Sequence, residues 1–207
     1  VYGIRSMADG VHYTSLEYTE VGNAVVKYAY RTGEAVDTLA KSNDIYGGPG
    51  RISGYQFSAD EQQLLVSSGH ESIYRHSYSA SYHTYRLGSE DAGQPLLADE
   101  AKVRLATFSP TGDKVAYVRD NNLWVVSLDN GSAPVQLTTD GRWNEVINGA
   151  SDWVYEEEFG KDRGFFWSPN GQRIAYYRFD ESAVREFGMP MYGSLYPDPD
   201  TFKYPTA

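Results

Sequence analysis

A serine-led turn recurs along this chain of 207 residues at intervals of about 50 to 60 residues. In each copy a strand-like segment leads to the serine, a turn follows, and an alternating strand comes next. The copies begin at Ser6, Ser58, Ser109 and Ser168. The last two read Ser-Pro-x-Gly, in which proline fixes φ and glycine supplies a positive φ. Repeats of roughly 40–50 residues, each holding several short strands, are typical of a β-propeller.

The composition agrees with an all-β fold. The chain has 18 tyrosines and 20 glycines, and its tyrosine-rich segments are separated by glycine, asparagine and aspartate. Sustained helical periodicity is not seen in any segment. We therefore expect a β-propeller of about four blades, each a four-stranded antiparallel sheet, and the blades are placed at about 1–43, 45–99, 101–142 and 144–207.

Individual strands can be placed within three of these blades. In the first blade they are 11–18, 24–31 and 34–39, with a hairpin turn at Thr32-Gly33. In the third they are 103–108, 114–119, 123–128 and 135–138, with tight turns at Asn121-Asn122 and Asp129-Asn130-Gly131. The fourth blade contains 164–167 and 174–180, and the segment 151–161 interrupts it.

That interrupting segment, which contains Asp-Trp-Val-Tyr-Glu-Glu-Glu-Phe-Gly, is the main candidate site. Three adjacent carboxylates between aromatic residues are costly unless a cation binds there. If Asp152 caps a short helical turn, Glu157 and Glu158 are about 100° apart around its axis and can still converge above a cavity. Two carboxylates and one further acceptor satisfy the three N–H donors of a primary ammonium. The alternative is a solvated acidic loop.

Arg75 is the second candidate, on a predicted strand at 73–82 that is crowded with aromatic residues. Its planar guanidinium offers paired donors to a carbonyl or a carboxylate. The alternative is a surface cation stacked on a tyrosine ring.

Several classes of function are disfavoured. A net charge of −10 repels phosphate backbones, so no nucleic-acid partner is expected. With no cysteine and no HxH or HExxH spacing, neither a metal nor a cofactor is expected. No apolar run is long enough for a transmembrane segment in this chain. Gly-x-Ser-x-Gly is absent and all four histidines precede residue 84, so we expect no catalytic triad here.

Three motifs carry a resemblance to a known family. The segment 152–158, followed by Phe-Trp-Ser-Pro-Asn-Gly at 166–171, closely resembles the dipeptidyl peptidase IV family of prolyl oligopeptidase-like serine peptidases. Arg-His-Ser-Tyr-Ser-Ala-Ser-Tyr at 75–82 is similar to a second stretch of that family, and Tyr-Pro-Thr-Ala at 204–207 is similar to a third, cut short. The resemblance covers the chain from the first blade onward.

The resemblance implies a fold and an activity. Family members have an eight-bladed N-terminal propeller and a C-terminal α/β-hydrolase domain that carries the Ser-Asp-His triad. They release Xaa-Pro or Xaa-Ala dipeptides from free peptide N-termini. By this resemblance, Glu157 and Glu158 bind the substrate ammonium and Arg75 contacts a substrate carbonyl. The chain would then be a partial N-terminal propeller without the hydrolase domain, and inactive alone.

The same resemblance implies the partners and the location. The expected partners are a peptide with a free N-terminus, the hydrolase domain of the same protein, and a second copy in a homodimer of the intact enzyme. The expected location is outside the cytoplasm, in the periplasm or at the cell surface of a bacterium.

Two alternatives stay open from the sequence. One is a non-catalytic propeller that serves as an interaction platform in a member that has lost its activity. The other is a carbohydrate-binding propeller, which the tyrosine and tryptophan content favours. The second is weaker, because no Ser-x-Asp-x-Gly-x-x-Trp repeat is present.

Overall fold

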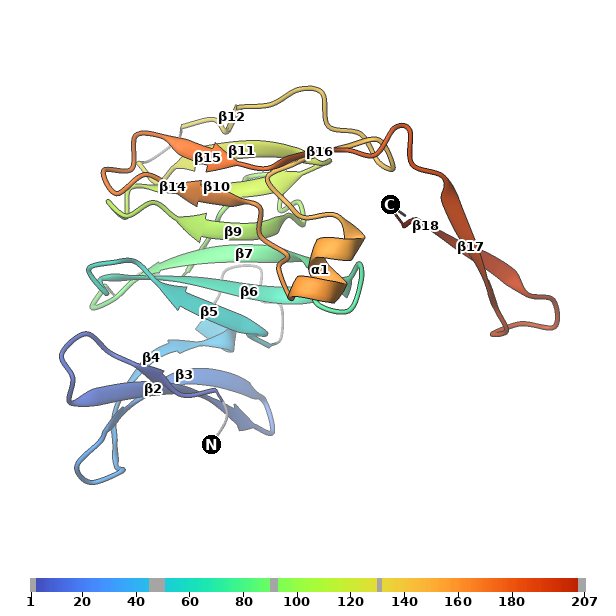
Figure 1. Cartoon of the computed structure of the whole chain (residues 1–207). Coiled ribbons are helices and arrows are strands. Elements are labelled where there is room, and N and C mark those ends of the chain that lie inside the picture. Colours follow the sequence, from blue (N-terminus) through green and yellow to red (C-terminus); the bar gives the residue numbers. More distant parts are fainter. Residues whose placement is uncertain (1–2, 45–50, 90–92, 130–131, 205–207) are drawn as a thin grey trace. The chain divides into compact units, whose positions relative to one another are not determined.

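The computed structural model describes residues 3–44, 51–89, 93–129 and 132–204 (Figure 1). It divides into two compact units. The first comprises Val1–Glu71 and Ala80–Lys102, and the second comprises Ser72–Ser79 and Val103–Ala207. The regular elements of the described residues are strands except for one short α-helix and one 3-10 turn, which confirms the all-β prediction.

Two four-stranded antiparallel sheets account for most of the first unit, in the orders β1-β2-β3-β4 and β5-β6-β7-β8. The first sheet contains β1 (Arg5–Ser6), β2 (His12–Thr19), β3 (Gly22–Ala29) and β4 (Ala35–Lys41), followed by the 3-10 turn η1 (Ser42–Asp44). The other contains β5 (Gly54–Phe57), β6 (Gln63–Ser72), β7 (Tyr78–Arg86) and β8 (Gln94–Pro95). Buried residues of both sheets, together with Ile52 just before β5, form one core, made of Val25, Ala40, Ile52, Tyr55, Leu64, Val66 and Tyr85.

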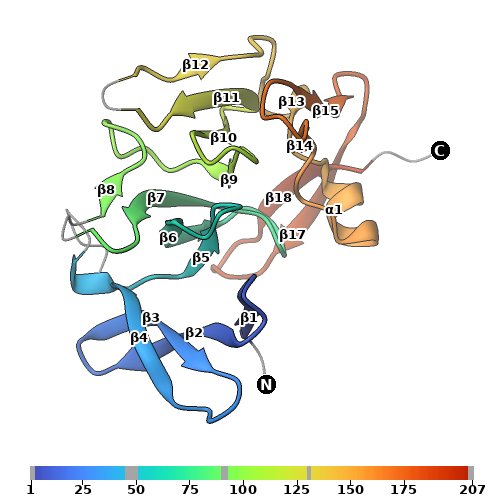
Figure 2. The same cartoon turned by 90° about the vertical axis from the view of Figure 1, so that its left-hand side faces the viewer.

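Besides the segment Ser72–Ser79, the second unit contains a third antiparallel sheet in the order β12-β11-β10-β9 (Figure 2). Its strands are β9 (Arg104–Phe108), β10 (Lys114–Arg119), β11 (Asn122–Ser127) and β12 (Val135–Gln136). After it come β13 (Val146–Asn148), α1 (Trp153–Phe159), β14 (Phe165–Trp167), β15 (Ile174–Tyr176), β16 (Arg178–Asp180), β17 (Glu186–Met191) and β18 (Asp198–Lys203). The core of this unit contains Ala116, Val118, Leu123, Ala150 and Phe165.

The range 144–207 differs from the single four-stranded sheet that was expected. Its described strands form three two-stranded pairs, β13 with β16, β14 with β15, and β17 with β18. The first two pairs meet at Tyr177, whose N–H donates to the Gly164 carbonyl and whose carbonyl accepts the Gly149 N–H. Helix α1 is inserted in the chain between β13 and β14, and these two strands belong to separate two-stranded pairs. The β17–β18 hairpin extends away from the rest of the second unit (Figure 1).

The repeated serine turn has a common hydrogen-bonding pattern in three of its four copies. The serine N–H donates to the carbonyl five residues later, and its Oγ accepts the N–H of that same residue. The pairs are Ser58 with Gln63, Ser109 with Lys114, and Ser168 with Arg173. In the first copy Met7 takes the serine's backbone position and donates to His12, while the Asp9 carboxylate accepts the His12 N–H.

The predicted hairpin turns agree with the backbone. Gly33 has φ +71° at the first predicted turn, and Asn121 has φ +55° at another. Both lie in the left-handed region that glycine and asparagine tolerate best. The third predicted turn, at residues 129–131, lies partly outside the described residues, as does the end of the segment 204–207.

Candidate functional site

The acidic segment folds as helix α1, and Asp152 caps its first turn as the sequence predicts. Asp152 has an extended backbone, and its Oδ1 accepts the Tyr155 N–H at 2.8 Å. At the other end Gly160 has φ +60°, and the N–H groups of Gly160 and Lys161 donate to the last helical carbonyls. These two caps satisfy backbone groups that such a short helix leaves without partners.

The three consecutive glutamates of α1 lie in different surroundings. Glu156 is fully buried, whereas the Glu157 side chain is 13% exposed and Glu158 is exposed. The Glu156 Oε1 accepts the N–H groups of His76 and Ser77, each at 2.7 Å. Glu156 therefore ties α1 to the segment Ser72–Ser79.

The role of Glu156 was missed at the sequence level. The signal that could have found it is its spacing of four residues from the cap at Asp152, because residues at i and i+4 share one face of a helix. Asp152 is also buried, so this face points into the protein. The acidic run is therefore a fully buried carboxylate followed by one that is largely buried and one that is exposed.

Arg75 lies in the connection between β6 and β7, so its prediction on a strand was wrong. The Ile73 N–H donates to the Ser77 carbonyl and closes this connection. Within this connection the N–H groups of His76 and Ser77 donate to the Glu156 carboxylate and not to a neighbouring strand. A long-range carboxylate thus replaces the ladder bonds that a strand would need here.

The connection brings Arg75 against the helix. Its Nε donates to the Glu157 Oε2 at 2.7 Å, and the Arg75 side chain is 72% exposed. Within the described residues the Glu158 carboxylate has no hydrogen-bond or ion-pair partner. The Arg75–Glu157 ion pair adds little to stability because Arg75 is so exposed, and its main effect is to fix the position of the Arg75 side chain. One guanidinium and two carboxylates leave a net charge of −1, which suits one monovalent cation.

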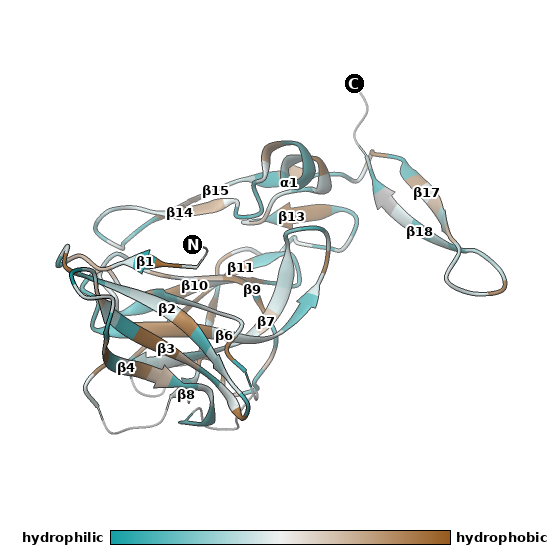
Figure 3. Cartoon of the chain, turned by 90° about the horizontal axis from the view of Figure 1, so that it is seen from below, coloured by the Kyte–Doolittle hydropathy of each residue, from teal (hydrophilic) through white to brown (hydrophobic). Residues whose placement is uncertain are grey.

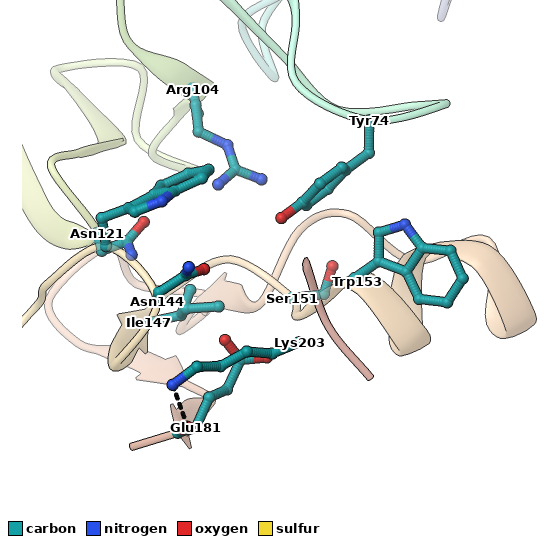
Figure 4. Close-up of a pocket in the computed structure, with 10 residues that line it drawn as sticks. Tyr74, Arg104, Asn121, Asn144, Ile147, Ser151, Trp153, Glu181 and Lys203 are labelled. Atoms are coloured by element: carbon teal, nitrogen blue, oxygen red, sulfur yellow. Dashed lines mark hydrogen bonds between the residues drawn. The ribbon is translucent and has the colours of Figure 1, made fainter. Parts of the chain in front are cut away.

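The second unit also contains a small polar cavity of about 20 Å³ (Figure 4). It is lined by Tyr74, Arg104, Asn121, Trp143, Asn144, Ile147, Ser151, Trp153, Glu181 and Lys203. Its volume is enough for about one water molecule. Burial raises the pKa of Glu181 to about 6, with a smaller contribution from the charge of Asp152, while Lys203 opposes the shift. The Lys203 Nζ donates to the Glu181 backbone carbonyl at 2.7 Å.

Glu181→Gln is expected to stabilise the protein above pH 7 and to have little effect near pH 4. A raised carboxyl pKa means that the ionised form is disfavoured in the folded state. The penalty is absent below the ordinary value of 4.5 and complete above the raised value of about 6. At pH 8 we expect a gain of about 1–2 kcal/mol in the free energy of unfolding. Urea unfolding at pH 5 and pH 8 measures this gain in the free energy of unfolding. The control is Glu20→Gln, which changes an exposed carboxylate. Equal gains for Glu181→Gln and Glu20→Gln would contradict the prediction.

No group of three or more His, Cys, Asp or Glu side chains suited to a metal ion lies in the described ranges. In the same ranges, no helix has the length and apolar character needed to cross a membrane.

Comparison with known proteins identifies the family. A model of the dipeptidyl peptidase IV (DPP IV) N-terminal region matches residues 58–207. The chain belongs to the dipeptidyl peptidase IV family. Helix α1 and the Arg75 segment both lie within the matched region of that family.

Individual relatives agree with this assignment. The chain is 41% identical over 165 residues to probable dipeptidyl-aminopeptidase B of Talaromyces marneffei, covering 72% of this chain and 18% of the relative. It is 33% identical over 189 residues to human prolyl endopeptidase FAP, covering 89% and 24%. Among solved structures, Porphyromonas gingivalis dipeptidyl peptidase 4 matches with a TM-score of 0.87 and 45% identity, over 99% of this chain and 29% of that one. The chain thus spans 18–29% of the lengths of these three proteins.

Proposed function

We propose that this chain is the substrate-positioning part of a serine exopeptidase that releases Xaa-Pro or Xaa-Ala dipeptides from free peptide N-termini. In this proposal the Ser-Asp-His triad lies in a C-terminal α/β-hydrolase domain outside the chain, and the chain alone is inactive. The observation that carries the proposal is the pairing of Arg75 with Glu157 next to the exposed Glu158. Membership of the dipeptidyl peptidase IV family supplies the reaction class.

The charges at the site favour a peptide ammonium as the ligand. Glu157 and Glu158 together exceed Arg75 by one negative charge, and a free N-terminus brings one positive charge. The ammonium has three N–H donors, which carboxylates accept through strong charge-assisted hydrogen bonds. A lysine side chain carries the same group, but it lies on a flexible stem and not at a fixed distance from the first peptide bonds.

Arg75 can serve a second part of the same ligand. Only its Nε is used in the contact with Glu157, which leaves the two terminal NH₂ groups for another acceptor. We propose that they bind a backbone carbonyl of the substrate, because a guanidinium matches such acceptors with planar geometry. Glu157 would then hold Arg75 in the orientation that this contact requires.

Anchoring the N-terminus sets the length of the product. An extended peptide spans at most about 3.3–3.6 Å per residue, so two residues cover about 7 Å. A nucleophile at this distance from the ammonium anchor cuts after the second residue. The chain's contribution to the reaction is therefore positioning, which turns the attack into an effectively intramolecular step.

Acetylation of the substrate tests the proposal in the full-length protein. We expect cleavage of Gly-Pro-p-nitroanilide and a loss of at least roughly 100-fold in kcat/KM after N-acetylation, because unpaired carboxylates cost several kcal/mol. Liberated p-nitroaniline is the measurement. Equal cleavage of both substrates would contradict the exopeptidase assignment and favour an endopeptidase. If neither is cleaved, the chain is better explained as a non-catalytic interaction platform.

We also propose a homodimer of the intact enzyme, with the β17–β18 hairpin at the interface. The large apolar residues that this hairpin exposes are Phe187, Met189, Met191, Tyr192, Leu195 and Tyr196. Figure 3 colours parts of β17 as hydrophobic. Exposed apolar groups that cluster in this way mark association surfaces. A second copy can cover them through the same patch.

Sedimentation of the full-length protein tests the dimer. The double variant Tyr192→Ser with Leu195→Ser should shift the mass from dimer to monomer at micromolar concentration. These two side chains are 80% and 92% exposed, so the fold should tolerate the change. The matched control is Val21→Ser, which replaces an apolar residue that is 78% exposed in the first unit. A double variant that remains a dimer would contradict this role of the hairpin.

The remaining proposals concern the whole protein. The four-stranded sheets are proposed to be blades of an eight-bladed propeller that sequence outside this chain completes. A bacterial source is favoured by the 45% identity to the Porphyromonas gingivalis protein, and we propose an exported protein in the periplasm or at the cell surface. Cell fractionation with activity confined to the cytoplasm would contradict the proposed location.

A further inference from the structure

The β17–β18 hairpin is anchored to the rest of its unit at its root. The side chains of residues 185–201 are exposed, so the arm of the hairpin itself buries little. Burial returns at Lys203, the last residue of β18, which is the one buried lysine among the described residues. Burying an ammonium group is costly unless it is hydrogen-bonded, so the hydrogen bond that Lys203 makes defines the root.

Lys203 fastens the end of the hairpin to the segment that leads into it. Its Nζ donates to the backbone carbonyl of Glu181 at 2.7 Å, and Glu181 is itself buried. The Glu181 N–H donates to the Glu145 carbonyl at 2.6 Å. At the start of β17, the Glu186 carboxylate accepts the Asn144 Nδ2 at 2.9 Å. Both ends of the hairpin are therefore held against the residues that precede β13.

The residue after Lys203 contacts helix α1. The ring of Tyr204 lies 5.4 Å from the ring of Trp153, centroid to centroid, in an edge-to-face arrangement. Such ring pairs attract each other beyond the area that they bury. Trp153 is the first residue of α1, and Glu157 lies four residues later on the same side of the helix. The hairpin root therefore contacts the helix that carries the proposed ammonium site, formed by Glu157 and Glu158.

The small polar cavity brings the same elements together. Its lining includes Glu181 and Lys203 from the hairpin root, Trp153 from α1, and Tyr74, which immediately precedes Arg75 in the chain. Figure 4 shows Lys203 and Glu181 joined by their hydrogen bond, with Trp153 and Tyr74 among the other residues around the cavity. The root of the hairpin, the start of α1 and the Arg75 connection thus meet at one place.

We propose that Lys203 and Tyr204 are positioning residues for the ammonium site. Lys203 fixes the root of the hairpin, and Tyr204 then holds Trp153 and with it the first turn of α1. A helix of seven residues is not stable by itself, so contacts of this kind determine where Glu157 lies. Neither residue needs to touch the substrate. The inference rests on the proposed exopeptidase function and gives a role to two residues that the sequence did not assign to the site.

Kinetics of full-length variants test Tyr204. Tyr204→Ser should lower kcat/KM for Gly-Pro-p-nitroanilide by roughly tenfold, mainly through KM, because a displaced Glu157 binds the ammonium less well. Cleavage of the N-acetylated substrate should stay at its wild-type rate, since this substrate has no ammonium. Tyr204→Phe keeps the ring contact and should retain at least about half of the wild-type kcat/KM.

The matched control for the kinetics is Tyr176→Ser. Tyr176 lies in the same unit and is 44% exposed, against 39% for Tyr204, and its loss should leave both substrates unaffected. A merely structural role of Tyr204 would lower the cleavage of both substrates by the same factor. That outcome, or wild-type kinetics in Tyr204→Ser, would overturn the proposal.

Hydrogen exchange gives a second readout that does not depend on catalysis. The N–H groups of Glu156 and Gly160 donate to carbonyls one turn earlier, and their exchange reports on the stability of α1. Exchange at both amides should become faster by at least about fivefold in Tyr204→Ser and in Lys203→Met, and should not change in Tyr176→Ser.

The exchange experiment also separates this inference from the proposed function. Should Lys203→Met fail to fold, Tyr204→Ser gives the same test, because its side chain is partly exposed. Unchanged exchange in the folded variants would overturn the inference. A wild-type protein that cleaves neither substrate would contradict the proposed function alone, since the exchange rates still decide whether the hairpin root holds α1.

Discussion

Glu157→Gln in the full-length protein is expected to lower kcat/KM for a dipeptidyl substrate with a free N-terminus by roughly 100-fold or more. Glutamine keeps the shape of the side chain but removes one charge, so the site no longer has an excess carboxylate for the ammonium. Removing one partner of a desolvated, hydrogen-bonded charge pair costs about 2–5 kcal/mol. Because the Glu157 side chain is only 13% exposed, solvent offers little compensation. Steady-state hydrolysis of Gly-Pro-p-nitroanilide measures the effect.

Two further variants sharpen this result. Glu158→Gln should lower kcat/KM in the same direction, since it removes the other carboxylate of the proposed ammonium site. Glu145→Gln, a partly exposed carboxylate of the same unit that pairs with Arg142, serves as control and should be neutral. Circular dichroism should report an unchanged fold in all three. Near-normal kcat/KM in both Glu157→Gln and Glu158→Gln would reject the ammonium site.

Glu156→Leu is expected to lower the free energy of unfolding by about 2–4 kcal/mol, the largest stability effect among these variants. The change leaves the His76 and Ser77 N–H groups without their acceptor. Urea unfolding at pH 7 measures the loss.

Glu156→Gln is the matched comparison for this prediction. Its amide oxygen can still accept the two N–H groups, so we expect a clearly smaller loss than in Glu156→Leu. Hydrogen exchange over residues 72–79 should rise in the leucine variant and much less in the glutamine variant. If Glu156→Leu were as stable as wild type, the carboxylate would not be holding the connection in place.

Local features of this protein could be predicted from sequence because their causes are local. The expected strands at 114–119 and 123–128 agree with β10 (Lys114–Arg119) and β11 (Asn122–Ser127), since alternating apolar residues and turn-forming asparagines act within a few positions. The cap at Asp152 was predictable for the same reason, because its acceptor and the Tyr155 donor lie three residues apart. The candidate residues Arg75, Glu157 and Glu158 were also selected from their chemistry and their motif.

Only the tertiary structure decided which of these groups meet. Arg75 and Glu157 are 82 residues apart in the chain, and Glu156 is 79 and 80 residues from the amides that it binds. The buried Glu156 takes N–H groups that would otherwise extend a strand, which is why Arg75 lies in a connection and not on β7. Two adjacent glutamates therefore make different contacts, Glu156 with the backbone of the connection and Glu157 with the Arg75 side chain, because burial on a helix depends on what packs against each face. The sequence identified the charges of the site, and packing between distant segments determined where each charge lies.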